Sequence, residues 1–233
     1  MLRRGEEFGA GLEFDDIALA HDHGALAIVD AVTSLGGIPL YVDAWGADAI
    51  YSGSQKCLSA PPGLSPLSFG ERAVAALKAR KTPVQSWFLD LSLVMAYWQG
   101  EGARSYHHTA PINMLYALHE SLLMLHEEGL EAAWARHRAN HLALRGGLAA
   151  LGLELLVDER HRLPQLNAVR IPDGVEDLPV RRRLLNDFGI EIGAGLGALA
   201  GKIWRIGLMG ASSHPESVAR VLEALAAVLG RKP

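Results

Sequence analysis

The sequence has one cysteine, no long apolar segment and no strong excess of charge of either sign. A single cysteine excludes a disulfide within the chain and fits a reducing compartment, so we expect a cytoplasmic protein. No apolar run approaches the ~20 residues that a membrane helix needs, and the N-terminus lacks the apolar stretch of a secretory signal. The sequence therefore predicts a soluble protein.

The weak charge also limits the partners. The formal net charge is -4 over 233 residues, without a basic stripe or polybasic tail, so we expect neither nucleic acid nor an anionic membrane as a main partner. The chain is 49% hydrophobic, which is enough for one large core or two small ones. Its 25 glycines among 233 residues are a larger share than the ~7% usual in globular proteins, which suggests many tight turns around a site.

The apolar pattern predicts an α/β chain. Short apolar, β-branched runs indicate strands at 25–29, 48–54, 64–69, 153–157, 165–171, 190–193 and 203–208. Helical spacing indicates helices at 70–81, 111–129, 129–152 and 178–189, and a last helix opened by Ser213 and Glu216 at capping-box spacing. A strand-rich part, a long helical pair and a β-β-α-β-β-α module follow one another. This order predicts two domains, 1–129 and 130–233.

One lysine has an unusual setting. Lys56 lies in YSGSQKCLSAPPG (51–63), among glycine and small polar residues and just before a Pro-Pro-Gly turn. An exposed lysine, with a pKa near ~10.4, is a poor nucleophile at neutral pH. Burial disfavours the ammonium form, and a carbonyl cofactor captures the free amine as a Schiff base. Lys56 is therefore a candidate for covalent chemistry, and a solvated surface lysine is the ordinary alternative.

A carboxylate precedes that lysine at a suitable place. Pyridoxal 5'-phosphate (PLP) uses such a lysine and also needs a carboxylate on its pyridine nitrogen. Asp30 closes the strand predicted at 25–29, and ligands of open α/β sheets bind at the carboxyl ends of strands. An aspartate in this place can also be the N-cap of a helix, so the pair by itself leaves both interpretations open.

Four separated motifs resemble a known family. They are AIVDAVTSLGG, YSGSQKCLSAPPG, YHHTAPINMLYALHESL and GKIWRIGLMG, and their order and spacing are similar to those of the class V PLP-dependent aminotransferases. Within that family the sequence is most similar to the alanine–glyoxylate and serine–glyoxylate aminotransferases. The resemblance implies the PLP-dependent transferase fold type I. We then expect an incomplete large domain with a mostly parallel sheet and an α/β C-terminal domain.

The resemblance also implies roles for residues around Lys56. Lys56 would hold PLP as a Schiff base and then move a proton between the substrate Cα and the cofactor. Asp30 would pair with the pyridine nitrogen, and Val32 would press against one face of the ring. Gln55 would hydrogen-bond the cofactor. For Val32 and Gln55 the alternatives are ordinary core packing and a solvated loop side chain.

The more distant motifs imply a dimer and a substrate clamp. In the family that it resembles, the Tyr-His-His-Thr segment crosses a dimer interface, so Tyr106 and Thr109 would bind the phosphate held by the partner subunit of a homodimer. Arg205 would bind the substrate carboxylate with both arms of its guanidinium, which lysine does less well. An ordinary ion pair on a strand is the alternative for Arg205.

The implied activity is that of a PLP-dependent transaminase. It would move an amino group from a small amino acid, alanine or serine, to glyoxylate or a similar 2-oxo acid. Chains of the family are longer at the N-terminus, where they supply a phosphate-binding helix N-terminus, an aromatic residue on the ring and further strands. A second hypothesis is therefore a non-catalytic remnant that folds and oligomerises without competent PLP binding.

Three other signals point elsewhere and are weaker. His21-Asp22-His23 and His107-His108 could suggest a metal site, but adjacent side chains diverge and no HExxH motif or matching cysteine set accompanies them. GAGLGALAGK (193–202) lacks the spacing and the Ser/Thr of a P-loop. Cys57 could suggest a resemblance to the cysteine desulfurases, which use the same cofactor. That resemblance implies a nucleophilic cysteine on a mobile loop and a histidine beside the lysine. Here Gln55 stands before the lysine, so we expect neither metal nor desulfurase chemistry.

Overall fold

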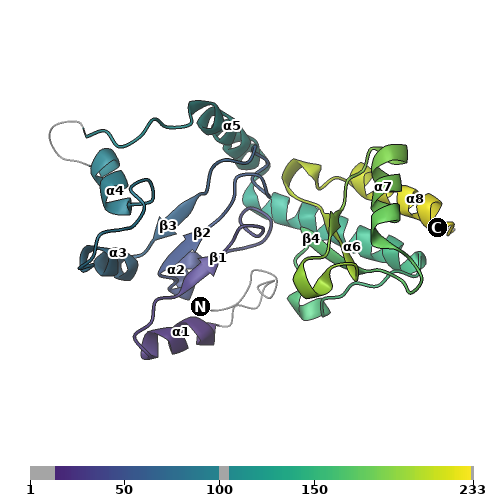
Figure 1. Cartoon of the computed structure of the whole chain (residues 1–233), viewed down its shortest axis with the longest axis horizontal. Coiled ribbons are helices and arrows are strands. Elements are labelled where there is room, and N and C mark those ends of the chain that lie inside the picture. The colour runs from purple at the N-terminus through teal and green to yellow at the C-terminus, as the bar shows by residue number, and fades with distance from the viewer. Residues whose placement is uncertain (1–13, 100–104, 232–233) are drawn as a thin grey trace.

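The computed structural model describes residues 14–99 and 105–231. The α-helices are α1 (Phe14–Asp22), α2 (Val42–Trp45), α3 (Glu71–Lys78), α4 (Leu91–Gln99), α5 (Ile112–Glu128), α6 (Leu130–Ala150), α7 (Asp177–Phe188) and α8 (Pro215–Leu229). The strands are β1 (Ile28–Asp30), β2 (Ala49–Tyr51), β3 (Leu67–Phe69), β4 (Leu166–Arg170), β5 (Gly193–Ala194) and β6 (Ile203–Gly207). Figure 1 shows β1–β3 toward one end of the molecule and α7 and α8 at the other end.

The N-terminal sheet has the order β1-β2-β3. β1 and β2 run parallel, with Asp30 opposite Tyr51, whereas β3 runs antiparallel to β2. The expected mostly parallel sheet therefore holds for the first pair of described strands and not for β3. Because β1 and β2 are parallel, their carboxyl ends meet at one edge, where Asp30 and the loop that carries Lys56 lie.

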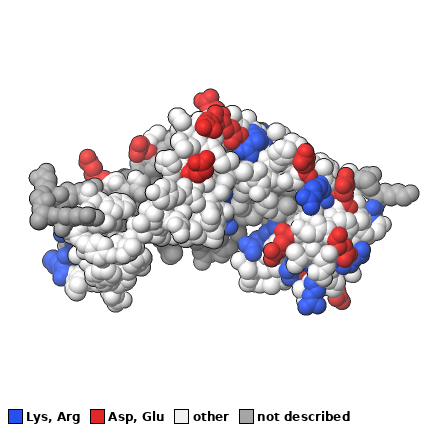
Figure 2. All heavy atoms as spheres, turned by 90° about the horizontal axis from the view of Figure 1, so that it is seen from above, with Lys and Arg blue, Asp and Glu red and all other residues white. Residues whose placement is uncertain are grey.

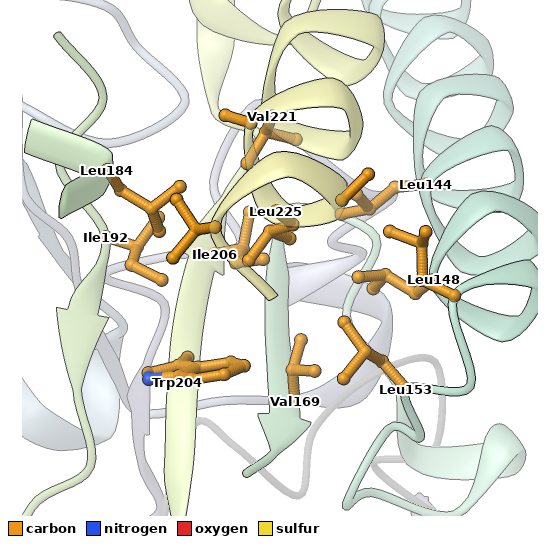
Figure 3. Close-up of a cluster of buried hydrophobic side chains, with 14 of the residues drawn as sticks. Leu144, Leu148, Leu153, Val169, Leu184, Ile192, Trp204, Ile206, Val221 and Leu225 are labelled. Carbon is orange, nitrogen blue, oxygen red and sulfur yellow. The ribbon is translucent and has the colours of Figure 1, made fainter. Parts of the chain in front are cut away.

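The C-terminal sheet has the order β4-β6-β5, and all its pairs are antiparallel. Helices α6 and α8 direct leucine and valine side chains onto strands β4 and β6, as Figure 3 shows. Trp204 on β6 and Val169 on β4 are fully buried there, together with Leu144 of α6 and Leu225 of α8. This cluster is the main hydrophobic core of the described residues, and it supports the strand that carries Arg205.

A buried carboxylate organises the N-terminal part. Asp48, 3% exposed, accepts hydrogen bonds from the backbone N–H of Ala27 (2.8 Å) and from the His21 ring (2.9 Å). Arg72 of α3 places its guanidinium 3.7 Å from the other carboxylate oxygen. One side chain thus ties α1, the start of β1 and α3 together, which matters because the apolar cluster here has only Ile17, Ala27 and Val29 as buried members.

Most predicted elements are present, with shifted ends. The four inner helices are confirmed as α3, α5, α6 and α7. The segment 153–157 makes only an isolated bridge, between Leu155 and Val169, and the strand predicted at 190–193 is reduced to β5. Helices α1, α2 and α4 were not predicted. The division into domains at residue 129 stays a prediction, although Gly129 with its φ of 85° does separate α5 from α6.

The predicted capping box of the last helix is wrong. The N-cap of α8 is His214, whose Nδ1 accepts from the N–H of Glu216 at 3.4 Å, with Pro215 in the first turn. Ser213 is fully buried instead, and its hydroxyl oxygen accepts a hydrogen bond from the side-chain amide of Asn140 of α6 at 3.2 Å. Its carbonyl oxygen accepts from the same amide and from Arg136. Tertiary contacts with α6 thus take Ser213 away from the local cap.

The surface gives two further facts. None of the helices among the described residues is long and apolar enough to cross a membrane. On the face shown in Figure 2, acidic and basic side chains are interspersed over the C-terminal end, without a large patch of one sign there.

Replacing Asp48 tests its role as an anchor. We expect Asp48→Ala to lower the free energy of unfolding by about 3 kcal/mol, because two hydrogen bonds and a buried carboxylate partner are lost together. Asp173→Ala, at an exposed position before α7, is the control and should change it by less than about 0.5 kcal/mol. Equal effects of the two variants in urea denaturation would contradict this role.

Candidate active site around Lys56

Small polar residues hold the lysine loop closed. The hydroxyl of Ser52 donates to the carbonyl oxygen of Ala31 (2.8 Å), and that of Ser54 donates to the carbonyl oxygen of Pro61 (2.7 Å). Both serines are buried, and Ala60 returns a backbone hydrogen bond to Ser54. Small side chains are therefore needed on each side of Lys56, because the chain doubles back within this loop. Lys56 itself is half-buried.

Asp30 has both carboxylate oxygens engaged. Oδ1 accepts from the backbone N–H of Val32 at 2.9 Å, and Oδ2 accepts from the hydroxyl of Tyr51 at 2.8 Å. The residues that follow, 32–34, form a turn and not a helix, so the N-cap alternative for Asp30 is wrong. The hydrogen bond from Tyr51 raises the pKa of that phenol above its usual value, with burial and the Asp30 charge as smaller causes.

Arg205 is held at one nitrogen. Its Nε donates to the carbonyl oxygen of Ala194 on β5 at 2.7 Å, and the guanidinium is half-buried. Among the described residues, Arg205 takes part in none of the ion pairs. The described residues therefore do not support an ordinary ion pair of Arg205. Its two terminal nitrogens remain for the carboxylate of a ligand.

These residues line one cleft. Asp30, Val32, Lys56 and Arg205 face a space of about 610 Å³, although Lys56 and Arg205 are far apart in sequence. The other lining residues are mostly apolar: Thr33, Leu166, Leu196, Gly197, Ala198, Leu199, Ile203 and Met209. The cleft thus combines one carboxylate, one amine and one guanidinium, supplied by both ends of the chain.

Three predicted residues lie elsewhere. Gln55 is exposed beside Lys56 and does not line the cleft. Tyr106 and Thr109 are also exposed and outside it, and their hydroxyl oxygens are 2.5 Å apart, within one hydrogen bond. The structure thus brings Tyr106 and Thr109 to each other and not to the Lys56 of their own chain. Their assignment to a partner's site stays a prediction.

The cleft depends on a junction that the sequence did not reveal. The N–H of Gly210, just after β6, donates to Nε2 of His137 at 2.9 Å, and its carbonyl oxygen accepts from Arg136 at 2.7 Å. The next amide, of Ala211, donates to the hydroxyl of Ser59 in the lysine loop at 2.8 Å. A Cβ at Gly210 would lie 1.9 Å from that hydroxyl oxygen, so only glycine fits.

A strained residue, Ser59, and an ion pair between Glu128 and Arg136 belong to the same junction. Ser59 is the only non-glycine residue with positive φ (64°) in the described part, an arrangement that costs of order 1 kcal/mol. Glu128 pairs with Arg136 at 2.5 and 2.7 Å, and this hydrogen bond holds the pKa of Glu128 below its usual value. Arg136 is thereby fixed to reach Gly210. No short motif encodes these contacts, because they join residues far apart in sequence.

Cys57 does not act as an exposed nucleophile. Its thiol is 3% exposed and donates to the carbonyl oxygen of Thr33 at 3.3 Å. Burial raises the pKa of the thiol to about 11, so it stays protonated at neutral pH. It also does not line the cleft that contains Lys56. The thiol is thus buried and protonated, whereas a nucleophilic thiol needs access to its substrate.

The histidine pairs serve separate contacts. His21 binds Asp48, whereas His23 bonds to the backbone carbonyl of Leu19. Nδ1 of His107 lies 2.7 Å from Nδ1 of His108, and the other nitrogen of His107 bonds to Trp87. Within residues 14–99 and 105–231, no group of three or more His, Cys, Asp or Glu side chains is placed to hold a metal ion.

Comparison with known proteins identifies the family. The model of the aminotransferase class-V family matches residues 5–214, so the chain belongs to this family. It is 46% identical over 217 residues to alanine–glyoxylate aminotransferase of Callithrix jacchus, covering 92% of this chain and 52% of that protein. It is 43% identical over 225 residues to (S)-ureidoglycine–glyoxylate transaminase of Bacillus subtilis, covering 89% and 54%.

Solved structures agree. The crystal structure of alanine–glyoxylate aminotransferase from Nostoc sp. superposes with a TM-score of 0.88 at 50% identity, covering 91% of this chain and 56% of that one. This similarity confirms the predicted PLP-dependent transferase fold type I. The chain spans about half the length of the curated relatives that it matches.

The protonation of His137 predicts a pH dependence of stability. Its Nδ1–H donates to the carbonyl oxygen of Ala133 and its Nε2 accepts from Gly210, so the folded chain needs the neutral ring. Burial lowers the pKa of His137 below 6.5, with the nearby Arg136 charge acting in the same direction. Because the unfolded chain then binds the proton more tightly, this contribution is complete above about pH 6.5 and is lost as the pH falls toward the folded pKa.

His137→Gln keeps an acceptor but does not titrate. Below about pH 6.5, the slope of the unfolding free energy against pH should be smaller in the variant than in the parent, by up to about 1.4 kcal/mol per pH unit. Part of the slope should remain, because burial also lowers the pKa of His141. His119→Gln, at an exposed site on α5, is the control and should keep the parent's profile. An unchanged slope in His137→Gln would contradict a neutral His137 ring in the folded chain.

Proposed function

We propose that this chain carries a PLP site and acts as a transaminase that moves an amino group from a small amino acid, alanine or serine, to glyoxylate or a similar 2-oxo acid. The observation that supports it most directly is the meeting of Asp30, Lys56 and Arg205 in one cleft. The relatives' names supply the substrates, since both curated relatives described above are glyoxylate transaminases.

The residues present fit PLP. The cleft volume of about 610 Å³ is within the range of roughly 300–1,000 Å³ that small-molecule sites have. When bound, PLP supplies an electron sink for the carbanion that forms at the substrate Cα. Asp30 would meet the pyridine nitrogen with a carboxylate already oriented by two donors. Val32 would cover one ring face, whereas Gln55, which lies outside the cleft, would have to turn toward it to bind the cofactor.

Lys56 and Arg205 would have different roles in the reaction. The amine of Lys56 would bind the cofactor and, once free, accept the proton from the substrate Cα. Arg205, which lines the cleft and whose Nε donates to Ala194, would orient the substrate by binding its carboxylate through the terminal nitrogens. Amino acid and 2-oxo acid share that carboxylate, so one arginine serves both halves of a ping-pong exchange. The apolar side chains of Leu166 and Leu199 favour a small substrate side chain.

We further propose a homodimer that works in the cytoplasm. Two exposed hydroxyls, on Tyr106 and Thr109, share one hydrogen bond, which leaves the other O–H of the pair to donate to a phosphate. Because they do not line their own chain's cleft, a partner subunit's site is the place that would use them. The single cysteine, Cys57, is a buried free thiol, which suits a reducing compartment.

Lys56→Ala tests the reaction. With PLP present and alanine or serine as donor to glyoxylate, we expect the turnover rate to fall by about 10²- to 10⁴-fold, because no other amine in the cleft can move the Cα proton. Lys78→Ala, at an exposed end of α3, is the matched control and should keep the parent's rate. A Lys56→Ala chain that transaminates as fast as the parent would refute the proposal.

Arg205→Lys tests the substrate clamp. Lysine keeps the charge but loses the planar fork, so we expect KM for the amino acid to rise about 10- to 100-fold with a smaller change in kcat. Arg170→Lys, at an exposed position on the neighbouring strand β4, serves as the control. If steady-state kinetics show equal KM values for parent and Arg205→Lys, Arg205 does not bind the carboxylate.

A further inference from the structure

We propose that Tyr51 is a positioning residue that holds Asp30 for the ring nitrogen of the cofactor. This inference rests on the proposed function and adds a residue to it. Tyr51 does not line the cleft and therefore acts through Asp30. Its hydroxyl donates to Oδ2 of Asp30 at 2.8 Å, whereas the N–H of Val32 donates to the other oxygen, Oδ1.

The sheet fixes this contact from both strands. Tyr51 and Asp30 are direct neighbours in the parallel β1–β2 pair, so their side chains leave the same face of the sheet. The carbonyl oxygen of Tyr51 accepts from the N–H of Ala31 at 2.9 Å, and the hydroxyl of Ser52 donates to the carbonyl oxygen of Ala31. The backbone on either side of the phenol–carboxylate bond is thus held, and the bond orients the Asp30 side chain.

The chemistry of the donor suits a pyridine partner. A carboxylate offers about four lone-pair positions, and Val32 and Tyr51 occupy two of them. The remaining positions can accept a ring N–H. Because a phenol is neutral, it orients the carboxylate and leaves its charge in place. A lysine or arginine in the same position would neutralise that charge. The raised pKa of Tyr51 keeps this donor protonated through neutral pH.

A purely structural role makes a different prediction. The ring of Tyr51 is 40% exposed, so the phenol could simply cover the sheet. Removal of its hydroxyl would then change stability alone. If Tyr51 positions Asp30, its removal weakens the binding of a cofactor only when that cofactor has a ring nitrogen for Asp30 to meet.

The experiment compares two chains with two cofactors. Parent and Tyr51→Phe are titrated with PLP and with the analogue in which carbon replaces the ring nitrogen, and Kd is measured by the quenching of protein fluorescence. We expect Tyr51→Phe to weaken PLP binding on the order of three- to ten-fold, as the loss of a partly exposed hydrogen bond to a charged group implies, and to leave the analogue's Kd unchanged. Tyr116→Phe, at a 73% exposed position on α5, is the matched control and should change neither Kd.

Each outcome decides between the hypotheses. Equal PLP affinity of parent and Tyr51→Phe overturns the positioning role while leaving the proposed function intact. An equal loss for both cofactors assigns Tyr51 a structural role and also overturns the inference. A parent chain that binds neither cofactor overturns the proposed function, and with it the role of Tyr51. Thermal unfolding of the variants without cofactor shows whether any loss follows from a change in folding.

Discussion

The hydrogen bonds at Gly210 are the constraint on which the cleft depends. They attach the segment after β6, and thus the strand of Arg205, to α6 through His137 and Arg136. The next amide, of Ala211, attaches the same segment to the lysine loop through Ser59. This junction joins the lysine loop to the segment that follows Arg205, and residues from both segments line the cleft. A glycine is required because a Cβ would collide with the Ser59 hydroxyl oxygen.

Around that junction, each charged group has a defined place. Asp30 is oriented by donors from its own loop and from β2, and Arg205 is tied at Nε to Ala194. Lys56 projects from a loop closed by buried serines. Cys57, the next residue, points instead to the Thr33 carbonyl and stays protonated. The loop therefore separates an available amine from an unreactive thiol.

Residues that stand in a local sequence motif could be placed from the sequence, whereas residues whose role depends on contacts between distant segments could not. Lys56 and Asp30 follow predicted strands, and the parallel pairing of β1 and β2 does bring them to one edge. Helices α1, α2 and α4 were missed because they are short or carry no clear apolar stripe. Ser213 was misassigned because Asn140, distant in sequence, binds its hydroxyl oxygen. Tyr51 escaped notice for the same reason, since only strand register places it beside Asp30.

The most direct test of a PLP site at Lys56 is reduction with borohydride. The purified chain is mixed with PLP, reduced, freed of excess cofactor, digested and analysed by mass spectrometry. We predict a phosphopyridoxyl group on the peptide that contains Lys56, and a lower yield when an amino acid substrate is present. A folded chain that retains no label, or that carries it equally on exposed lysines such as Lys78, would contradict the account and favour a remnant without a competent cofactor site.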